Sequence, residues 1–258
     1  MKKLLALLFI ATLAYSCKKN GTSPAAEKFL ISSENVTDYQ PGDTANYQLI
    51  MTYNNHNMLT TVEDINGISL PVYYIYTYDE NDNMLDTWIR DGADTAKTTG
   101  FPLDTTIFNY ANGLPVSSSY TEYGLNGPQL LNTYKIANNK ISEVAFSGTG
   151  NAAGFADITY KGNNFDTFTY AGGAITTYTY GTHNSPLLYT GYKYYLASVL
   201  YVKNDNEILE IRTVSATGQV DDQKFTYTYN SQGYPIKQVE TDNGTPAETI
   251  VYSYKPEN

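Results

Sequence analysis

The chain of 258 residues contains one cysteine, Cys17, and two histidines, so several kinds of chemistry lack the residues they need. A disulfide within the chain is excluded, and so is a metal site built from several cysteines. His56 and His183 are far apart in the sequence, each lies in a segment typical of a turn or loop, and no HExxH-type spacing occurs. We interpret both histidines as solvated loop residues.

Motifs for acyl and phosphoryl chemistry are also missing, since the sequence has no Gly-x-Ser-x-Gly elbow, no phosphate loop and no dinucleotide fingerprint. We expect a protein that is not an enzyme and needs no cofactor. The distant alternative is a glycoside hydrolase that uses two carboxylates, because acidic residues are numerous and spacing alone selects no pair. The candidates are Glu63, Asp64, Asp86, Glu122, Glu143, Asp157 and Glu210.

Basic residues are scarce, at 16 Lys and Arg against 26 Asp and Glu. No basic cluster offsets this imbalance, so binding to nucleic acid or to anionic lipid by charge is not expected. Removal of residues 1–16 would leave 14 basic residues and a formal charge of about −12.

No apolar run reaches the roughly 20 residues that a membrane-spanning helix requires. The longest, Leu4–Leu13, follows a basic start and precedes Ala14-Tyr15-Ser16-Cys17, which is the layout of a cleaved signal peptide. It resembles a bacterial lipoprotein signal, and the resemblance implies that residues 1–16 are removed and that Cys17 carries a diacylglycerol and an N-acyl chain such as palmitate. The alternative is an ordinary secretory signal with an incidental cysteine.

The small, polar residues that follow indicate a flexible tether over residues 17–28. Lys18 stands where an aspartate would resemble an inner-membrane retention signal, so the outer membrane is favoured. We expect a periplasmic or surface-facing protein that is attached to this membrane by the lipid on Cys17.

Residues 29–258 are rich in tyrosine, 26 in the whole chain, and show no long segment with helical periodicity. Alternating Tyr/Thr strands are followed by turns rich in Asn, Asp and Gly, and the phrase recurs every 20 to 25 residues or so. The pattern predicts an all-β meander of about 14 to 18 antiparallel strands in a strongly curved or partly closed, barrel-like sheet. Two sub-domains that meet near residues 148–154 are an alternative. The clearest copies are Leu49–Leu59, Tyr74–Leu85 and Phe225–Ile236, and weaker copies include Tyr178–Leu187 and Val199–Ile208.

The repeated phrase Tyr-[Asp/Asn]-x-x-[Gly/Asp/Asn]-x-[Leu/Pro] resembles the tyrosine-aspartate (YD, or Rhs-type) repeats. Together with the N-terminal signal it is similar to uncharacterised lipoproteins of Bacteroidota, one family of which, of unknown function, has a porin-like fold. That resemblance implies a broad antiparallel sheet and assigns no catalytic residue. The sequence lacks a clean lipid-facing alternation, so we do not expect a membrane channel.

Two kinds of site remain as candidates. Asp79, Asn81 and Asn83 are spaced as at the start of a calcium loop, but Met84 and Arg90 stand where such a loop needs Gly and Glu, so we expect an ordinary turn and no metal. Aromatic side chains at strand spacing could instead form a binding face, with Trp88 beside a polar flap at residues 91–104. The candidate ligand contacts are Trp88, Tyr74, Tyr76, Tyr78, Tyr227 and Tyr229.

The leading hypothesis is a non-enzymatic envelope lipoprotein that binds a glycan, a peptide or another envelope ligand on an aromatic face of the sheet. The alternative is a structural or assembly protein, whose sheet docks a protein partner in the outer membrane by its face or edge.

Overall fold

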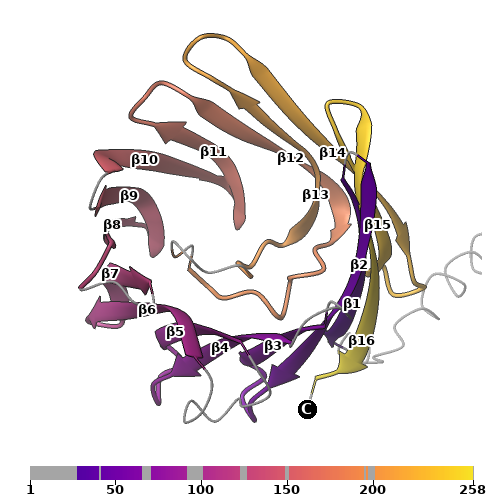
Figure 1. Cartoon of the computed structure of the whole chain (residues 1–258), viewed down its shortest axis with the longest axis horizontal. Helices are drawn as coiled ribbons and strands as arrows, with labels where there is room; N and C mark the ends of the chain where they lie inside the picture. Colours follow the sequence, from indigo (N-terminus) through magenta and orange to yellow (C-terminus); the bar gives the residue numbers. More distant parts are fainter. Residues whose placement is uncertain are drawn as a thin grey trace, which may run out of the picture.

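The chain folds into one closed antiparallel β-barrel of 16 strands, in which each strand pairs with its neighbours in sequence and β1 closes the ring by pairing with β16 (Figure 1). The computed structural model describes residues 28–40, 42–65, 71–91, 101–122, 127–148, 151–194, 196 and 201–257. The described residues contain no helix. The strands are β1 (Phe29–Gln40), β2 (Asp43–Tyr53), β3 (Leu59–Ile65), β4 (Val72–Tyr78), β5 (Met84–Asp91), β6 (Phe101–Ala111), β7 (Leu114–Glu122), β8 (Leu130–Ala137), β9 (Lys140–Gly148), β10 (Asn151–Lys161), β11 (Asn164–Tyr170), β12 (Ile175–Asn184), β13 (Asn206–Val214), β14 (Val220–Tyr229), β15 (Pro235–Asp242) and β16 (Thr245–Pro256).

The repeated turn is the local feature that the sequence predicted best. After β4, the Asp79 carboxylate accepts hydrogen bonds from the main-chain N–H groups of Asn81 and Asn83, and Asp82 adopts a positive φ of 58°. Asn54 and Asn230 accept the same pair of bonds in the turns after β2 and β14. An Asx side chain that caps a turn and a residue that tolerates positive φ explain why Asn, Asp and Gly recur at these places.

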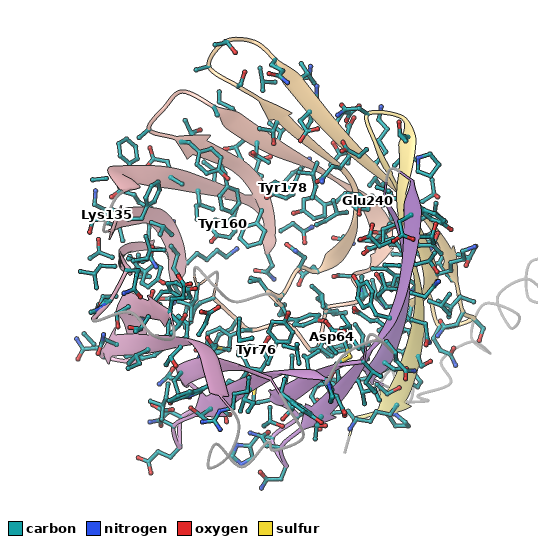
Figure 2. All side chains as sticks on the ribbon, in the orientation of Figure 1. Asp64, Tyr76, Lys135, Tyr160, Tyr178 and Glu240 are labelled. Carbon is teal, nitrogen blue, oxygen red and sulfur yellow. The ribbon has the colours of Figure 1, made fainter. Side chains whose placement is uncertain are left out.

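The barrel has two walls of opposite character. Figure 2 shows Tyr76, Tyr160 and Tyr178 pointing into the lumen and Lys135 pointing away from it. Because side chains alternate along a strand and directly paired residues share a face, the strand register extends these two faces around the barrel. The inner wall carries buried side chains that include Met51, Val62, Tyr76, Phe108, Tyr134, Val144, Ile158 and Phe168.

The outer wall mixes polar and apolar side chains over the described strands. Thr37 bonds Asn46, Thr159 bonds Thr167, and the Lys135 ammonium lies 2.6 Å from a Glu143 carboxylate oxygen. Apolar side chains are exposed on the same wall at Ile107, Leu131, Phe155, Ile175 and Val251. The outer face therefore carries threonine pairs and ion pairs interspersed with single apolar side chains.

Tyrosine hydroxyls fasten neighbouring strands inside the barrel. Tyr78 donates to the carbonyl of Leu59, and four other tyrosines donate in the same way to a carbonyl at or near the start of the preceding strand. Each bond spans a hairpin, so the repeated tyrosine is first an architectural residue. The other donor–acceptor pairs are Tyr53–Ile31, Tyr160–Ile141, Tyr227–Ile208 and Tyr254–Pro235.

The connection between β12 and β13 enters the lumen over its described residues, 185–194, 196 and 201–205, which we call the inner loop (Figure 1). Its two arms are joined by hydrogen bonds from Tyr192 N–H to Tyr201 O (2.7 Å) and from Lys203 N–H to Tyr192 O (3.0 Å). The Tyr192 hydroxyl accepts a bond from the Met84 N–H of β5 and bonds the Tyr110 hydroxyl of β6. Leu196 is completely buried. The loop thus fills part of the barrel and is fastened to its opposite wall.

The inner loop corrects the prediction of a hairpin at Tyr178–Leu187 and of a second one at Val199–Ile208. β12 extends to Asn184, and Tyr201 and Val202 lie in the inner loop before β13 begins at Asn206. Tyr201 and Val202 can both be apolar because both pack against the core inside the barrel. The Gly148–Gly154 segment, considered above as a junction, lies at the hairpin of β9 and β10, which pair directly.

Candidate functional site

A cavity of about 280 Å³ lies between the inner loop and the wall formed by β9–β11; we call it the lysine cavity. Lys140 comes from the start of β9, and Lys193 and Lys203 come from the two arms of the inner loop. Tyr160, Phe165 and Tyr194 supply aromatic rings to the same lining. The amides Asn139 and Asn163 belong to the turns at this end of the barrel.

The lysines are held over aromatic rings. Lys140 Nζ lies 4.8 Å from the centroid of the Tyr160 ring and donates to the Gly162 carbonyl, and Lys193 Nζ lies 5.2 Å from the Tyr194 ring centroid. Lys193 also donates to Asn83 Oδ1 at 3.3 Å, which links the inner loop to the turn before β5. Cation–π contacts orient the ammonium groups without neutralising their charge.

The described lining of the lysine cavity includes no acidic side chain, although acidic residues outnumber basic ones in the chain. Three ammonium groups therefore meet in a partly enclosed space, and the carboxylates nearest to them lie behind the lining, where Asp205 accepts a hydrogen bond from Asn163 and Asp79 feels the charge of Lys193. Rings, amides and cations together can stack on a sugar ring, hydrogen-bond its hydroxyls and pair with an anionic group.

A second cavity of about 270 Å³ lies on the other side of the inner loop, against β13–β16 and β1; we call it the Glu34 cavity. Tyr201 and Asn204 of the inner loop face Phe225, Tyr227 and Tyr252 of the wall across it. The Glu34 side chain projects from β1 into this space. Glu34 is buried, at 6% exposure. Burial, and then the negative charge of Glu248, raise the pKa of Glu34 to about 7.

The structure brings together some of the aromatic residues that the sequence selected. Tyr74, Tyr76 and Trp88 border a smaller cavity of about 170 Å³ with Asp104 and Tyr120. Tyr74 and Tyr76 belong to the inner wall and pair with Ile89 and Thr87 of β5. Trp88 lies between these two residues in β5, so its side chain points to the opposite face of the sheet. Its indole N–H donates to Asp86 Oδ1 at 2.8 Å. Residues 92–100 of the predicted flap lie outside the described residues.

The other selected tyrosines have different surroundings. The hydroxyls of Tyr78 and Tyr227 are used by the strand-fastening bonds, although the Tyr227 ring also borders the Glu34 cavity. Tyr229 donates to Glu207 Oε1 at 3.1 Å and stacks on His183, with 3.9 Å between ring centroids. The predicted aromatic residues therefore do not form one continuous face.

The histidines are more constrained than solvated loop residues would be. His183 Nδ1 lies 3.3 Å from the buried Glu207 carboxylate, and His56 Nδ1 lies 2.9 Å from Asp82 Oδ1 in the neighbouring turn. Both side chains are still about half exposed. The prediction that the histidines are solvated agrees with this exposure. It did not include their carboxylate partners, because these come from turns that are distant in the sequence.

The proposed start of a calcium loop is a turn. Both Asp79 oxygens are engaged, Oδ1 by two main-chain N–H groups and Oδ2 by the Asn83 amide, and these bonds lower the pKa of Asp79. Within the ranges that the structure describes, no group of three or more His, Cys, Asp or Glu side chains is arranged to hold a metal ion.

The candidate carboxylates separate onto the two walls. Asp64 faces the lumen, where burial raises its pKa, and Glu122 lies in register with Asp104. Glu143 and Glu210 pair with lysines of the outer wall, and Asp157 lies opposite Glu143. None of the described cavities is lined by two of these carboxylates.

Sequence reasoning missed Glu34 and the three lysines of the lysine cavity. Glu34 occupies an inward position of a strand that otherwise carries Ile31 and Val36 on that face, which is the one local signal available. No local sequence signal marks Lys193 and Lys203, because they come close to Lys140 only when the inner loop enters the barrel.

Among the described residues, no helix is long and apolar enough to cross a bilayer. No family model and no curated protein matches the sequence. Among solved structures, the chain is similar to a porin-like protein from Bacteroides uniformis, with 14% identity and a TM-score of 0.55 over 87% of this chain and 96% of the other. A porin-like protein from Bacteroides vulgatus gives 11% identity and a TM-score of 0.42 over 89% and 100%. The first of these likenesses shows that the chain shares the fold of a porin-like barrel protein from Bacteroides.

Proposed function

We propose that this protein is an envelope lipoprotein that binds an acidic glycan in the lumen of its barrel, at the lysine cavity. The observation that carries the proposal is the joint presence of Lys140, Lys193 and Lys203 with aromatic rings and amides, and with no acidic residue in the described lining. A sugar that bears a carboxylate offers a ring to stack, hydroxyls to hydrogen-bond and a charge to pair. The binding role is non-enzymatic.

Charged pairs on the outer wall support attachment by lipid in place of insertion into the bilayer. A membrane-spanning barrel presents an outward apolar band about 25 Å tall, and charged residues in such a band are destabilising. Here the described outer wall carries the Lys135–Glu143 and Lys224–Asp222 pairs. We propose that Cys17, which lies outside the described residues, carries the lipid and that residues 17–28 act as the tether.

The lipid anchor is tested by the variant Cys17→Ser. We expect the unaltered protein to fractionate with the outer membrane and Cys17→Ser to become soluble in the periplasm or medium. A variant that stayed in the membrane would contradict the anchor and would leave the glycan site untouched.

The glycan site is tested by calorimetric titration with a short oligogalacturonate. We expect Lys193→Met and Lys203→Met each to weaken binding about tenfold, which is the loss of one charge-assisted contact. Lys237→Met, on the outer wall of β15, is the matched control. Equal binding of a neutral oligosaccharide of the same length, or no loss in the lysine variants, would refute the proposed ligand class.

The alternative of a structural protein has one observation against its simplest form. The edge-docking mode requires an unpaired strand, and β1 and β16 pair over nine positions from Phe29 to Asp38. Docking of a protein partner on a face of the sheet is the form of this alternative that is open to test. The test is to capture partners with a barrel whose lysine cavity has been altered, so that the glycan site is not the bait.

A further inference from the structure

Glu34 is a carboxyl group in an aromatic enclosure, and its surroundings differ from those of the other buried polar groups. It is 6% exposed, and among the described residues neither oxygen has a hydrogen-bond or ion-pair partner. In the buried Glu207, one carboxylate oxygen receives a hydrogen bond from Tyr229 and lies beside His183, and the other has no hydrogen-bond partner. A buried carboxyl without a partner is costly, so its retention in a cavity points to a ligand that completes it.

The groups around Glu34 are aromatic, acidic, aliphatic or neutral polar, the last being Ser185, Asn204 and Gln238. The titratable ones are Glu248, Tyr252 and Tyr254 of β16, Tyr53 of β2 and Tyr201 of the inner loop. No Lys, Arg or His borders the Glu34 cavity within the described lining. The protein therefore supplies no counter-charge of its own.

The acidic character continues along the inner wall. Glu34 pairs in register with Tyr252. Four residues further along β1, beyond the Val36–Ile250 pair, Asp38 lies opposite Glu248, which in turn lies opposite Glu240. Burial raises the pKa of Glu248 and of Glu240, as expected where carboxylates gather in a partly closed space. Such a row concentrates cations near Glu34.

We propose that the Glu34 cavity is a second binding site, independent of the lysine cavity, for a small ligand that carries an ammonium group. The Glu34 carboxylate pairs with the cation, and the faces of Tyr201, Tyr227 and Tyr252 surround its carbon atoms. A cation enclosed by aromatic rings and one carboxylate is a known means of recognising organic ammonium groups. The volume of about 270 Å³ admits an amino sugar or a quaternary amine.

The test uses tetramethylammonium, whose charge does not change with pH, and the pair glucosamine and N-acetylglucosamine, which differ in that charge. Binding to the full-length protein is followed by NMR line broadening of each probe. We expect millimolar or tighter binding of tetramethylammonium at pH 8.5 and of glucosamine at pH 7.5, where a large share of its amine is still protonated. N-acetylglucosamine should bind at least tenfold more weakly than glucosamine at pH 7.5, and tetramethylammonium should bind at least tenfold more weakly to Glu34→Gln. Glu80→Gln, in the exposed turn after β4, is the matched control.

A measurement on the unaltered protein makes the test independent of variant folding. Binding of tetramethylammonium should weaken at least tenfold between pH 8.5 and 5.5 as Glu34 takes up a proton, and Glu34→Gln should abolish this dependence. No binding at 50 mM probe, equal binding of the two sugars, or full binding to Glu34→Gln would each overturn the proposal. None of these results bears on oligogalacturonate binding at the lysine cavity, which is measured separately.

Discussion

Tyr78 donates its hydroxyl hydrogen to the main-chain carbonyl of Leu59 across 2.6 Å, 19 residues earlier in the chain. Tyr160, Tyr227 and Tyr254 reach back over the same separation of 19 residues, each to a carbonyl of the preceding strand. The sequence repeat is thus reproduced as a repeated hydrogen bond, which fastens one strand of each hairpin to the next.

The first prediction concerns this bond. Tyr78→Phe keeps the ring and removes the donor that bonds the Leu59 carbonyl. We expect a loss of about 1 kcal/mol in the free energy of unfolding, measured by urea denaturation. Tyr39→Phe, at an exposed position of β1, is the matched control and should change stability by less than about 0.5 kcal/mol. Equal stability of the two variants would show that the bond carries no net free energy.

A second prediction concerns the fastening of the inner loop. Tyr192 accepts the Met84 N–H, so Tyr192→Phe leaves that amide without its acceptor while it keeps the buried ring. We expect hydrogen exchange at Met84 to accelerate about tenfold or more, as measured by NMR. Tyr194→Phe is the control, because the Tyr194 ring lies beside Tyr192 and Met84 bonds Tyr192 instead. Unchanged exchange at Met84 in Tyr192→Phe would contradict this role.

A third prediction concerns the contact between the two arms of the inner loop. A methyl group at Gly191 would collide with the main chain of Val202 and Lys203. Gly191→Ala should therefore cost about 1–3 kcal/mol of stability and should weaken ligand binding beside the loop. Gly172→Ala is the same substitution where nothing lies within 4 Å of the added methyl, and it should be neutral. Thermal unfolding of both variants compares them directly, and equal melting temperatures would refute the close approach.

The fourth prediction is a pH dependence of stability. The pKa of Glu34 is about 7 in the folded protein and about 4.5 when exposed, so between these values the folded state binds more protons than the unfolded state. Stability contributed by protonated Glu34 is therefore present below about pH 4.5 and is lost as the pH rises through 7, by about 3 kcal/mol at most. Urea denaturation from pH 4.5 to 8 should show a flatter profile for Glu34→Gln than for the unaltered protein.

Glu80→Gln again serves as the control for that profile, because its side chain is exposed in a turn. Other inward carboxylates with raised pKa values, such as Glu240, also lower the free energy of unfolding as the pH rises. The quantity to compare is therefore the difference in free energy of unfolding between Glu34→Gln and the unaltered protein at each pH. A steeper profile in Glu34→Gln would contradict the assignment.

Local features of this fold could be predicted from the sequence, and long-range ones could not. The turns at Asn57, Asp82 and Gly233 follow from residues that tolerate positive φ, and all three adopt it. The number of strands, 16, falls within the range expected from the repeat. The sequence did not decide whether the sheet closes into a barrel. The pairing of β1 with β16 joins residues at opposite ends of the sequence and leaves no local pattern.

The candidate sites were harder to predict for the same reason. Tyrosines with alternate spacing looked alike in the sequence, yet Tyr78 fastens strands, Tyr229 supports Glu207, and Tyr74 borders a cavity. What distinguishes them is the partner across the lumen. Lys140 and Lys193 lie 53 positions apart, and only the path of the inner loop brings them into one cavity.

The central claim, that the lumen beside the inner loop binds an acidic glycan, is tested most directly by hydrogen–deuterium exchange with and without a saturating oligogalacturonate. We expect slower exchange at residues 139–141, 160–165, 192–194 and 201–203, and no change at the outer-wall pair of Lys224 and Glu210. Protection confined to the outer wall, or none anywhere at a concentration that saturates binding, would contradict it.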